Sequence, residues 1–289
     1  MPAITTLALA ALAIAQQTDT TVAVGARVRL EVHTHAGEIR VSTWSQNAVR
    51  IRAEHSSRTR IDIEGAQSSL QVRARTARGE PANVDFVITV PASAQLALSG
   101  ISTDLSVDGT AGEVTGETVS GDVTVRGGSE YVSLRSVEGD ITLSDATGRV
   151  DVGSVNGDVQ LMNIRGRIVA ETVNGDVSLE RIASEDIEAG TVSGDVTFTG
   201  ALADRGRYRL TTHNGDLSVT VPERVNATVS VSTFNGEFES GFPVTLTEFR
   251  PGKRFTFTLG SGSAHLELES FNGTIQLRRE GQTPRREER

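Results

Sequence analysis

A short phrase recurs along this chain with a spacing of 18 residues. It contains an apolar residue, then Ser, Asn or Glu, then Gly and Asp, and then Val or Ile, a polar residue and an apolar residue. The clearest copies begin at Val119, Val137, Val155 and Val173. Later copies follow at spacings of 19 and 21 residues. A fixed short period indicates a repeat architecture, in which each unit stacks on its neighbours.

Each repeat contains two short alternations of apolar and polar residues, which are typical of half-buried β-strands. Eighteen extended residues give roughly 60 Å of contour, enough for one closed coil of two or three strands. Stacked coils would place equivalent residues about 4.8 Å apart. We expect two inward apolar ladders, one with Val123, Ile141, Val159, Val177, Val196 and Leu217, and the other with Val125, Leu143, Leu161, Leu179, Phe198 and Val219.

The sequence therefore predicts an all-β protein that forms a single elongated, right-handed β-solenoid with coils of 18–21 residues. The alternative is a series of hairpins in an antiparallel sandwich or barrel, whose strands need not share a length. We expect N-terminal strands, first coils and a cap over residues 16–100, and regular repeats over residues 101–220. Wider coils and a second cap are expected over residues 221–277, followed by a disordered polar tail over 278–289.

Residues 1–15 have the pattern of a secretory signal peptide. An apolar run leads to Ala13-Ile14-Ala15, which places small residues where signal peptidase recognises them. The run is shorter than the roughly 20 residues that span a bilayer, so we expect no transmembrane segment in the mature chain. We therefore predict export to the periplasm, the cell surface or the medium after cleavage near Ala15.

The composition excludes several classes of function. The chain has 28 basic and 37 acidic residues and a net charge of −9, which argues against nucleic acid as a partner. It has no cysteine, so disulfides, thiol catalysis and cysteine-ligated zinc are excluded. Aromatic residues make up only 4% of the chain, which suits thin stacked layers of Val, Ile and Leu.

The glycine of each phrase is a candidate structural turn residue. Glycine adopts positive φ without strain, and the Asn, Ser or Glu before it favours a tight turn. We expect this role at Gly121, Gly139, Gly157, Gly175, Gly194, Gly215, Gly236 and Gly273.

An aspartate follows the glycine in most copies, so the stacked coils predict a ladder of carboxylates. Like charges about 5 Å apart repel unless they are screened, hydrogen-bonded or bridged by a cation. Calcium binds six to eight oxygen ligands, but the known calcium-binding repeat has a period of nine. We favour a carboxylate that accepts a hydrogen bond from a backbone N–H in its own turn, and we expect no cofactor. The calcium alternative would involve Asp122, Asp140, Asp158, Asp176, Asp195 and Asp216.

Other polar residues are interpreted as solvated surface. His33 and His35 lie two residues apart on one strand face, and a surface pair is favoured over a metal site. Arg50, Arg52, Arg58 and Arg60 form a local basic patch in the sequence. No hydrolase, metalloprotease or phosphate-loop motif occurs, so no catalytic residue is predicted. A polar stripe suited to a glycan, a peptide or solvent contains Thr124, Thr142, Gln160, Ser178, Thr197 and Ser218.

Four segments together resemble the DUF4097 group of bacterial adhesin β-strand-repeat proteins, which is related to the head-domain GIN proteins. The opening Gly37-Glu38-Ile39-Arg40-Val41 with Trp44 is similar to the first motif of that group, and Val87 to Pro91 resembles the strand that precedes its repeats. The Gly-Asp-Val copies form the middle, and the segment from Gly260 to Ile275 resembles the closing strand pair. The resemblance covers roughly residues 20–277, and it implies an exported β-solenoid without established catalytic residues.

We expect a non-enzymatic exported protein, an adhesin or cell-envelope scaffold that binds a protein or polysaccharide through its solenoid surface. One alternative is a sensory or structural module of an envelope-stress system. A polysaccharide-active β-helix enzyme is the other, and it would need clustered carboxylates in a cleft. The short, uniform turns of the repeats disfavour such a cleft.

Overall fold

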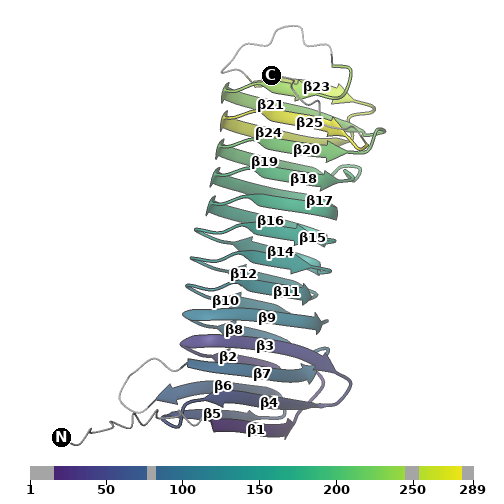
Figure 1. The fold of residues 1–289 in the computed structure, drawn as a ribbon. Coiled ribbons are helices and arrows are strands. Elements are labelled where there is room, and N and C mark those ends of the chain that lie inside the picture. The colour runs from purple at the N-terminus through teal and green to yellow at the C-terminus, as the bar shows by residue number, and fades with distance from the viewer. Residues whose placement is uncertain (1–15, 77–82, 245–253, 282–289) are drawn as a thin grey trace, which may run out of the picture.

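The computed structural model describes residues 16–76, 83–244 and 254–281. Every regular element in these residues is a β-strand, and the strands stack into a tall column with the N-terminal strands at one end (Figure 1). The predicted signal peptide over residues 1–15 lies outside the described residues. Strand β25 (Ile275–Arg279) extends two residues into the segment that was expected to be a disordered tail, and residues 282–289 of that tail are not described.

The strands pair into two ladders, here called face A and face B, which lie back to back. Face A contains, from the N-terminal end, β5 (Thr59–Ala66), β6 (Ser69–Thr76), β2 (Arg29–His33), β8 (Gln95–Ser99), β10 (Val114–Glu117), β12 (Tyr131–Arg135), β14 (Thr147–Gly153), β16 (Arg165–Asn174), residues 183–193 of β17 (Val177–Ser193), β19 (Arg207–Asn214), β24 (Ala264–Asn272), β21 (Ala227–Asn235) and β23 (Arg254–Leu259). Face B contains β1 (Gln16–Ala23), β4 (Ala48–His55), β7 (Asn83–Pro91), β3 (Ala36–Trp44), β9 (Ser102–Thr110), β11 (Val123–Gly127), β13 (Ile141–Ser144), β15 (Val159–Met162), residues 177–182 of β17, β18 (Val196–Gly200), β20 (Leu217–Val221), β25 and β22 (Phe238–Ser240).

The middle of the column is built from parallel strands that are offset by one repeat. Val123 of β11 is in register with Ile141 of β13, and Ile141 with Val159 of β15. On face A, Val132 of β12 is in register with Val150 of β14. Each coil therefore contributes one strand to each face, as a β-solenoid requires. Parallel pairing excludes the antiparallel hairpin alternative for this region, whereas the right-handed sense of the coil stays a prediction.

The core is a continuous apolar layer between the two faces. Both predicted inward ladders are confirmed, because their members are in register from coil to coil and are at most 1% exposed. Face A contributes the facing residues, for example Val132, Leu134, Val150 and Val152. Burial of one such side chain contributes about 1.5–3 kcal/mol before entropy is counted. Because the strands alternate, the residues between these positions point outward on either face.

The two ends depart from the order of the sequence. The β2–β3 coil lies between the β6–β7 coil and the β8–β9 coil. At the other end, the β24–β25 coil lies between the β19–β20 coil and the β21–β22 coil. The outermost strands β1, β5 and β23 pair antiparallel to their neighbours. Both faces at the N-terminal end, and face A at the C-terminal end, therefore finish in a strand that breaks the parallel pattern, whereas β22 on face B is parallel to β25.

Candidate binding surface

A ladder of buried hydroxyl groups supports the corner where each coil passes from face A to face B. The side chain of Thr172 donates to the carbonyl of Gly157 at 2.9 Å, and Ser154 donates to the carbonyl of Gly139 at 3.1 Å. Ser136, Thr191, Thr212 and Ser270 make equivalent bonds to the glycine of a neighbouring coil. Thr118 donates instead to the carbonyl of Thr103 at 2.9 Å, and the buried hydroxyl of Thr233 makes no hydrogen bond with the described residues. The sequence interpretation did not identify this ladder, although Thr or Ser stands three residues before the glycine in the copies at Thr118, Ser136, Ser154, Thr172, Thr191, Thr212, Thr233 and Ser270.

The corner glycines stack so closely that a side chain has no room. A Cβ added to Gly139 would lie 2.1 Å from the carbonyl oxygen of Gly121, and one on Gly157 would lie 2.1 Å from that of Gly139. Most of the eight glycines also have positive φ between 142° and 156°. Gly157 and Gly236 are not among the positive-φ residues, contrary to the expectation, so steric contact with the neighbouring coil is the requirement common to all eight.

The aspartates form the expected ladder, with each carboxylate bonded to the next coil. The backbone N–H of Asp158 donates to Oδ1 of Asp140 at 2.8 Å, and that of Asp176 donates to Oδ1 of Asp158 at 2.8 Å. The favoured acceptor role therefore holds, but the donor belongs to the following coil rather than to the same turn. We call this set the aspartate ladder; Asp104 extends it before Asp122, and its members are Asp104, Asp122, Asp140, Asp158, Asp176, Asp195 and Asp216.

The carboxylates of the aspartate ladder are not gathered into a cluster. The described residues contain no group of three or more His, Asp or Glu side chains arranged to hold a metal ion. One oxygen of each ladder carboxylate is already an acceptor for a backbone N–H, and the ladder makes no ion pair with any other described residue. The ladder is therefore a row of mostly exposed, uncompensated negative charges along one corner of the column.

A continuous column of exposed apolar side chains runs beside the aspartate ladder. Its members occupy the first position of each phrase, one per coil. They are in register because the residue after each member pairs with the equivalent residue of the neighbouring coil. They are 39–54% exposed. Among the described residues, Val87 is the only other large apolar side chain with comparable exposure. We call this set the apolar column: Ile101, Val119, Val137, Val155, Val173, Val192, Phe271 and Phe234, with His213 between Val192 and Phe271.

Aromatic rings continue the column at its C-terminal end. The rings of His213 and Phe271 stack with centroids 4.6 Å apart, and those of Phe271 and Phe234 with centroids 4.8 Å apart. These separations equal one strand spacing, so the rings follow the stacking of the coils. The apolar column thus extends over nine successive rows of face A.

A shallow groove lies on face A along the apolar column. It has a volume of about 650 Å³, and Val137, Val155, Val173 and Val192 line it. Gly153 and Gly190 also line the groove, and as residues without side chains they account for its depth there. A second hollow of about 510 Å³ continues it past Thr211 to Phe271 and Phe234. The apolar column and the adjoining hollows together form one continuous candidate contact surface.

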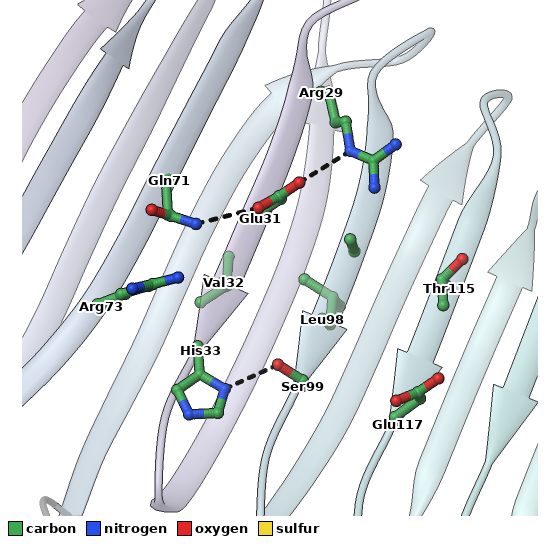
Figure 2. Close-up of a pocket in the computed structure, with 11 residues that line it drawn as sticks. Arg29, Glu31, Val32, His33, Gln71, Arg73, Leu98, Ser99, Thr115 and Glu117 are labelled. Atoms are coloured by element: carbon green, nitrogen blue, oxygen red, sulfur yellow. Dashed lines mark hydrogen bonds and ion pairs between the residues drawn. The ribbon is translucent and has the colours of Figure 1, made fainter.

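A third hollow, of about 490 Å³, lies at the N-terminal end of face A (Figure 2). Within it, Arg29 donates to Glu31 at 3.0 Å and Gln71 donates to the same carboxylate at 3.1 Å. His33 and Ser99 share a hydrogen bond of 2.9 Å. These five side chains satisfy one another on an exposed sheet, and Arg73 and Glu117 also line the hollow.

The remaining predicted surface residues are placed as follows. His33 and His35 are both exposed, and His55 is instead buried, with its Nε2 2.9 Å from Thr18 Oγ1. The arginines close in sequence do not share one face, because Arg50 lies on face B and pairs with Asp19, whereas Arg60 lies on face A and pairs with Asp62. The polar stripe of Thr124 and its equivalents points outward on face B beside the aspartate ladder.

Two ionisable sites have shifted pKa values, and both shifts have structural causes. The hydrogen bond from Arg50 lowers the pKa of Asp19, which joins β1 to β4. Burial raises the pKa of Tyr208, whose hydroxyl donates to the carbonyl of Ser184 at 2.6 Å and accepts from the N–H of Ala203 at 2.7 Å. Asp19 and Tyr208 both lie away from the apolar column, and each shift is explained by the ion pair or the burial just described.

These features define a two-faced, mainly parallel β-solenoid with an apolar column and a carboxylate ladder along one corner. The chain belongs to the Toastrack DUF4097 family, whose model matches residues 28–278. The resemblance noted in the sequence is therefore confirmed. No curated protein matches the chain.

Several solved structures are similar over most of their length but at low identity. A "putative adhesin" from Parabacteroides distasonis is 11% identical, with 92% of this chain and 98% of that chain covered and a TM-score of 0.44. Another protein of that name, from Bacteroides fragilis, is 12% identical, with 91% and 97% covered and a TM-score of 0.39. A "putative lipid binding protein" from Parabacteroides distasonis is 11% identical, with 90% and 96% covered and a TM-score of 0.33. Such distant similarity assigns no ligand.

Proposed function

We propose that this protein is a non-enzymatic, exported binding scaffold that holds a partner at the cell envelope along its apolar column. The observation that carries the proposal is the column itself. Scattered apolar residues are normal on a surface, but a contiguous apolar patch with a polar rim marks an interaction site. Here the exposed apolar side chains gather in one line over nine rows, beside a groove and a row of carboxylates.

The non-enzymatic part of the proposal is supported by the way the polar groups are used. The aspartates bond to backbone N–H groups, most corner hydroxyls bond to glycine carbonyls, and most charged side chains on face A pair with one another. Catalytic acids and bases are recognised by perturbed pKa values in a cleft. The groups with shifted pKa values in the described residues, Asp19, Arg50 and Tyr208, are explained by an ion pair and by burial.

Export is proposed from the pattern of the first fifteen residues. The described residues contain no helix that is long and apolar enough to cross a membrane. N-terminal sequencing of the protein recovered from a fractionated producing cell tests this part. A mature N-terminus near Gln16 in the envelope or medium supports it, whereas an intact Met1 in the cytoplasmic fraction contradicts it.

Site-directed photo-cross-linking tests the binding surface. A photoreactive residue at Val155, which is 39% exposed, probes the apolar column. The matched control carries the photoreactive amino acid in place of Val87, which is 38% exposed and lies on β7 of face B. We expect a discrete cross-linked partner in the envelope from Val155 and not from Val87. Equal products at both positions, or none at either, would contradict a partner bound along the column.

A further inference from the structure

The geometry points to an amphipathic α-helix with a cationic flank as the partner of the apolar column. This inference rests on the proposed function and adds the chemistry of the occupant. The helix would lie parallel to the axis of the solenoid, with its apolar stripe on the column and its Lys and Arg side chains over the aspartate ladder.

The spacing of the apolar column matches one apolar side chain per helical turn. Its rows are one strand spacing apart, about 4.8 Å, whereas a helix rises about 5.4 Å per turn. The two periods differ by about 0.6 Å per step, which adds up to about 2 Å over the four valines that line the groove, a drift that flexible Leu or Met side chains absorb. Over all nine rows the drift reaches about one row, so about seven helical turns would lie along nine rows. An extended peptide would instead place same-face residues about 6.8 Å apart. Nine rows span roughly 40 Å, the length of a helix of about 26 residues.

The charges beside the column select a cationic partner. The ladder aspartates are exposed except for Asp158, which is half-buried, and they make no ion pair with the described residues. Glu138 adds a further negative charge at the same corner. On the groove side, Glu117 and Glu171 are exposed, and each stands two residues before a member of the apolar column, Val119 or Val173. A helix with Lys and Arg beside its apolar stripe would neutralise these charges, and complementary charges also accelerate association.

The same charges disfavour two other occupants. A second copy of the chain would bring a second row of carboxylates close to the first, and like charges at an interface are unfavourable. The headgroups of an anionic membrane would also be repelled by the aspartate ladder. These occupants are therefore treated as outcomes of the test.

The test measures binding of a synthetic peptide to the full mature protein. The probe is a helical peptide of about 26 residues with Leu on one stripe and Lys on both flanks. One control peptide carries Glu in place of every Lys, and another has the same composition in scrambled order. We expect the Lys peptide to bind, with an affinity that falls as salt is raised, and the two control peptides not to bind.

Two triple variants separate the apolar and the electrostatic contributions. The change of Val137, Val155 and Val173 to Thr keeps the β-branched shape and should weaken binding roughly 30-fold with the same salt dependence. The change of Asp140, Asp158 and Asp176 to Asn keeps the Oδ1 acceptor and should weaken binding roughly tenfold at low salt with a flatter salt dependence. Asp204→Asn is the control outside the ladder, because its carboxylate also accepts a hydrogen bond, from Ser263.

The other possible results each contradict either the helical partner or the binding scaffold. Equal binding of the Lys and Glu peptides, or binding unaffected by either triple variant, overturns the inference. A dimer at micromolar concentration that the Val→Thr variant dissociates identifies a second copy as the occupant and also overturns it. If no peptide binds while Val155 still gives a cross-linked partner, the helix is wrong and the binding scaffold stands. If both measurements are negative, the proposed function fails as well.

Discussion

At the scale of single residues, Gly157 isolates the steric reason for the corner glycine. Its φ is not in the positive range, but an added Cβ would meet the carbonyl oxygen of Gly139 at 2.1 Å. We expect Gly157→Ala to lower the free energy of unfolding by about 1–3 kcal/mol, because the coils would have to move apart. Denaturant unfolding measures this. Gly25→Ala is the control, since its Cβ would meet nothing closer than 3.4 Å, and an equal loss there would refute the steric explanation.

Asp158 tests whether the aspartate ladder acts as a hydrogen-bond acceptor or only as a row of charges. Asp158→Ala removes the acceptor of the Asp176 N–H and should cost about 0.5–1.5 kcal/mol. Asp158→Asn keeps an oxygen at the same place and removes repulsion from Asp140 and Asp176, so its stability should equal or exceed that of the parent at low salt. Thermal unfolding of the two variants side by side decides the matter, and an Asn variant as unstable as the Ala variant would disprove the acceptor role.

Tyr208 predicts how stability depends on alkaline pH. Burial raises its pKa above the ordinary value of 10.0 in the folded state, so the folded protein holds the phenolic proton more tightly than the unfolded chain. The resulting stability is complete below about pH 10 and is lost as the pH rises through the folded-state pKa. Tyr208→Phe removes two hydrogen bonds and should cost about 1–3 kcal/mol at pH 7.

Unfolding of both proteins between pH 7 and 11 checks this dependence. The Phe variant should lose less stability than the parent over the alkaline part of that range, because it has no phenol to ionise. Parallel pH profiles for the two proteins would show that Tyr208 does not contribute.

The residues that the sequence predicted correctly are those whose neighbours follow strict alternation. Val123 and Val125 lie on a simple strand, so their inward direction could be read from period two. Val119 has the same parity as Val123, yet it points outward while Val123 is buried. The Gly121-Asp122 corner reverses the alternation between them, and the sequence alone does not show this reversal. The residues of the apolar column are therefore visible in the sequence as the first position of each phrase, but the sequence does not show that they lie on the surface.

At the scale of elements, the coil is the unit that the sequence specifies. Deletion of residues 140–157 removes one repeat and joins Gly139 to Asp158, which restores the phrase. We expect a folded, shorter solenoid with a slightly lower melting temperature, because each coil contacts only its neighbours. Circular dichroism with thermal unfolding measures both properties.

A deletion of half a coil, residues 141–149, is the matched control. It removes β13 and places a face A strand where a face B strand is required. Cooperative unfolding should be lost in this variant. If the full-coil deletion is as damaging as the half-coil deletion, the coil is not the unit of assembly.

The sequence predicted the parallel coils of the middle but not the reversed order at the ends. The middle coils share one length, so their pairing follows from the period. Two coils, β2–β3 and β24–β25, are each inserted next to a coil that is distant in the chain. For example, β25 pairs with β20 on one side and with β22 on the other. No periodicity records such an insertion, because it depends on which segment packs best against the open edge.

At the scale of the whole molecule, the charge of the protein predicts its response to salt. The net charge is −9, and the aspartate ladder concentrates part of it along one corner. Salt screens this repulsion, so the melting temperature should rise by a few degrees between about 10 and 150 mM NaCl. The Asn triple variant of Asp140, Asp158 and Asp176 should show a smaller rise. A parent protein whose melting temperature falls with salt would contradict this account.

The reversed coil order at the C-terminal end has a consequence for synthesis. A ribosome delivers β21 and β22 before β24 and β25, although β24 and β25 occupy the layer directly on β19 and β20. The intervening segment takes about 1–5 s to translate at roughly 5–20 residues per second. During that interval the edge of β19 is open to the wrong neighbour, and β21 shares with β24 the phrase that fits it. The β24–β25 layer lies beneath β21 and β22 but is made after them, so this end of the column cannot close in the order in which the chain is made.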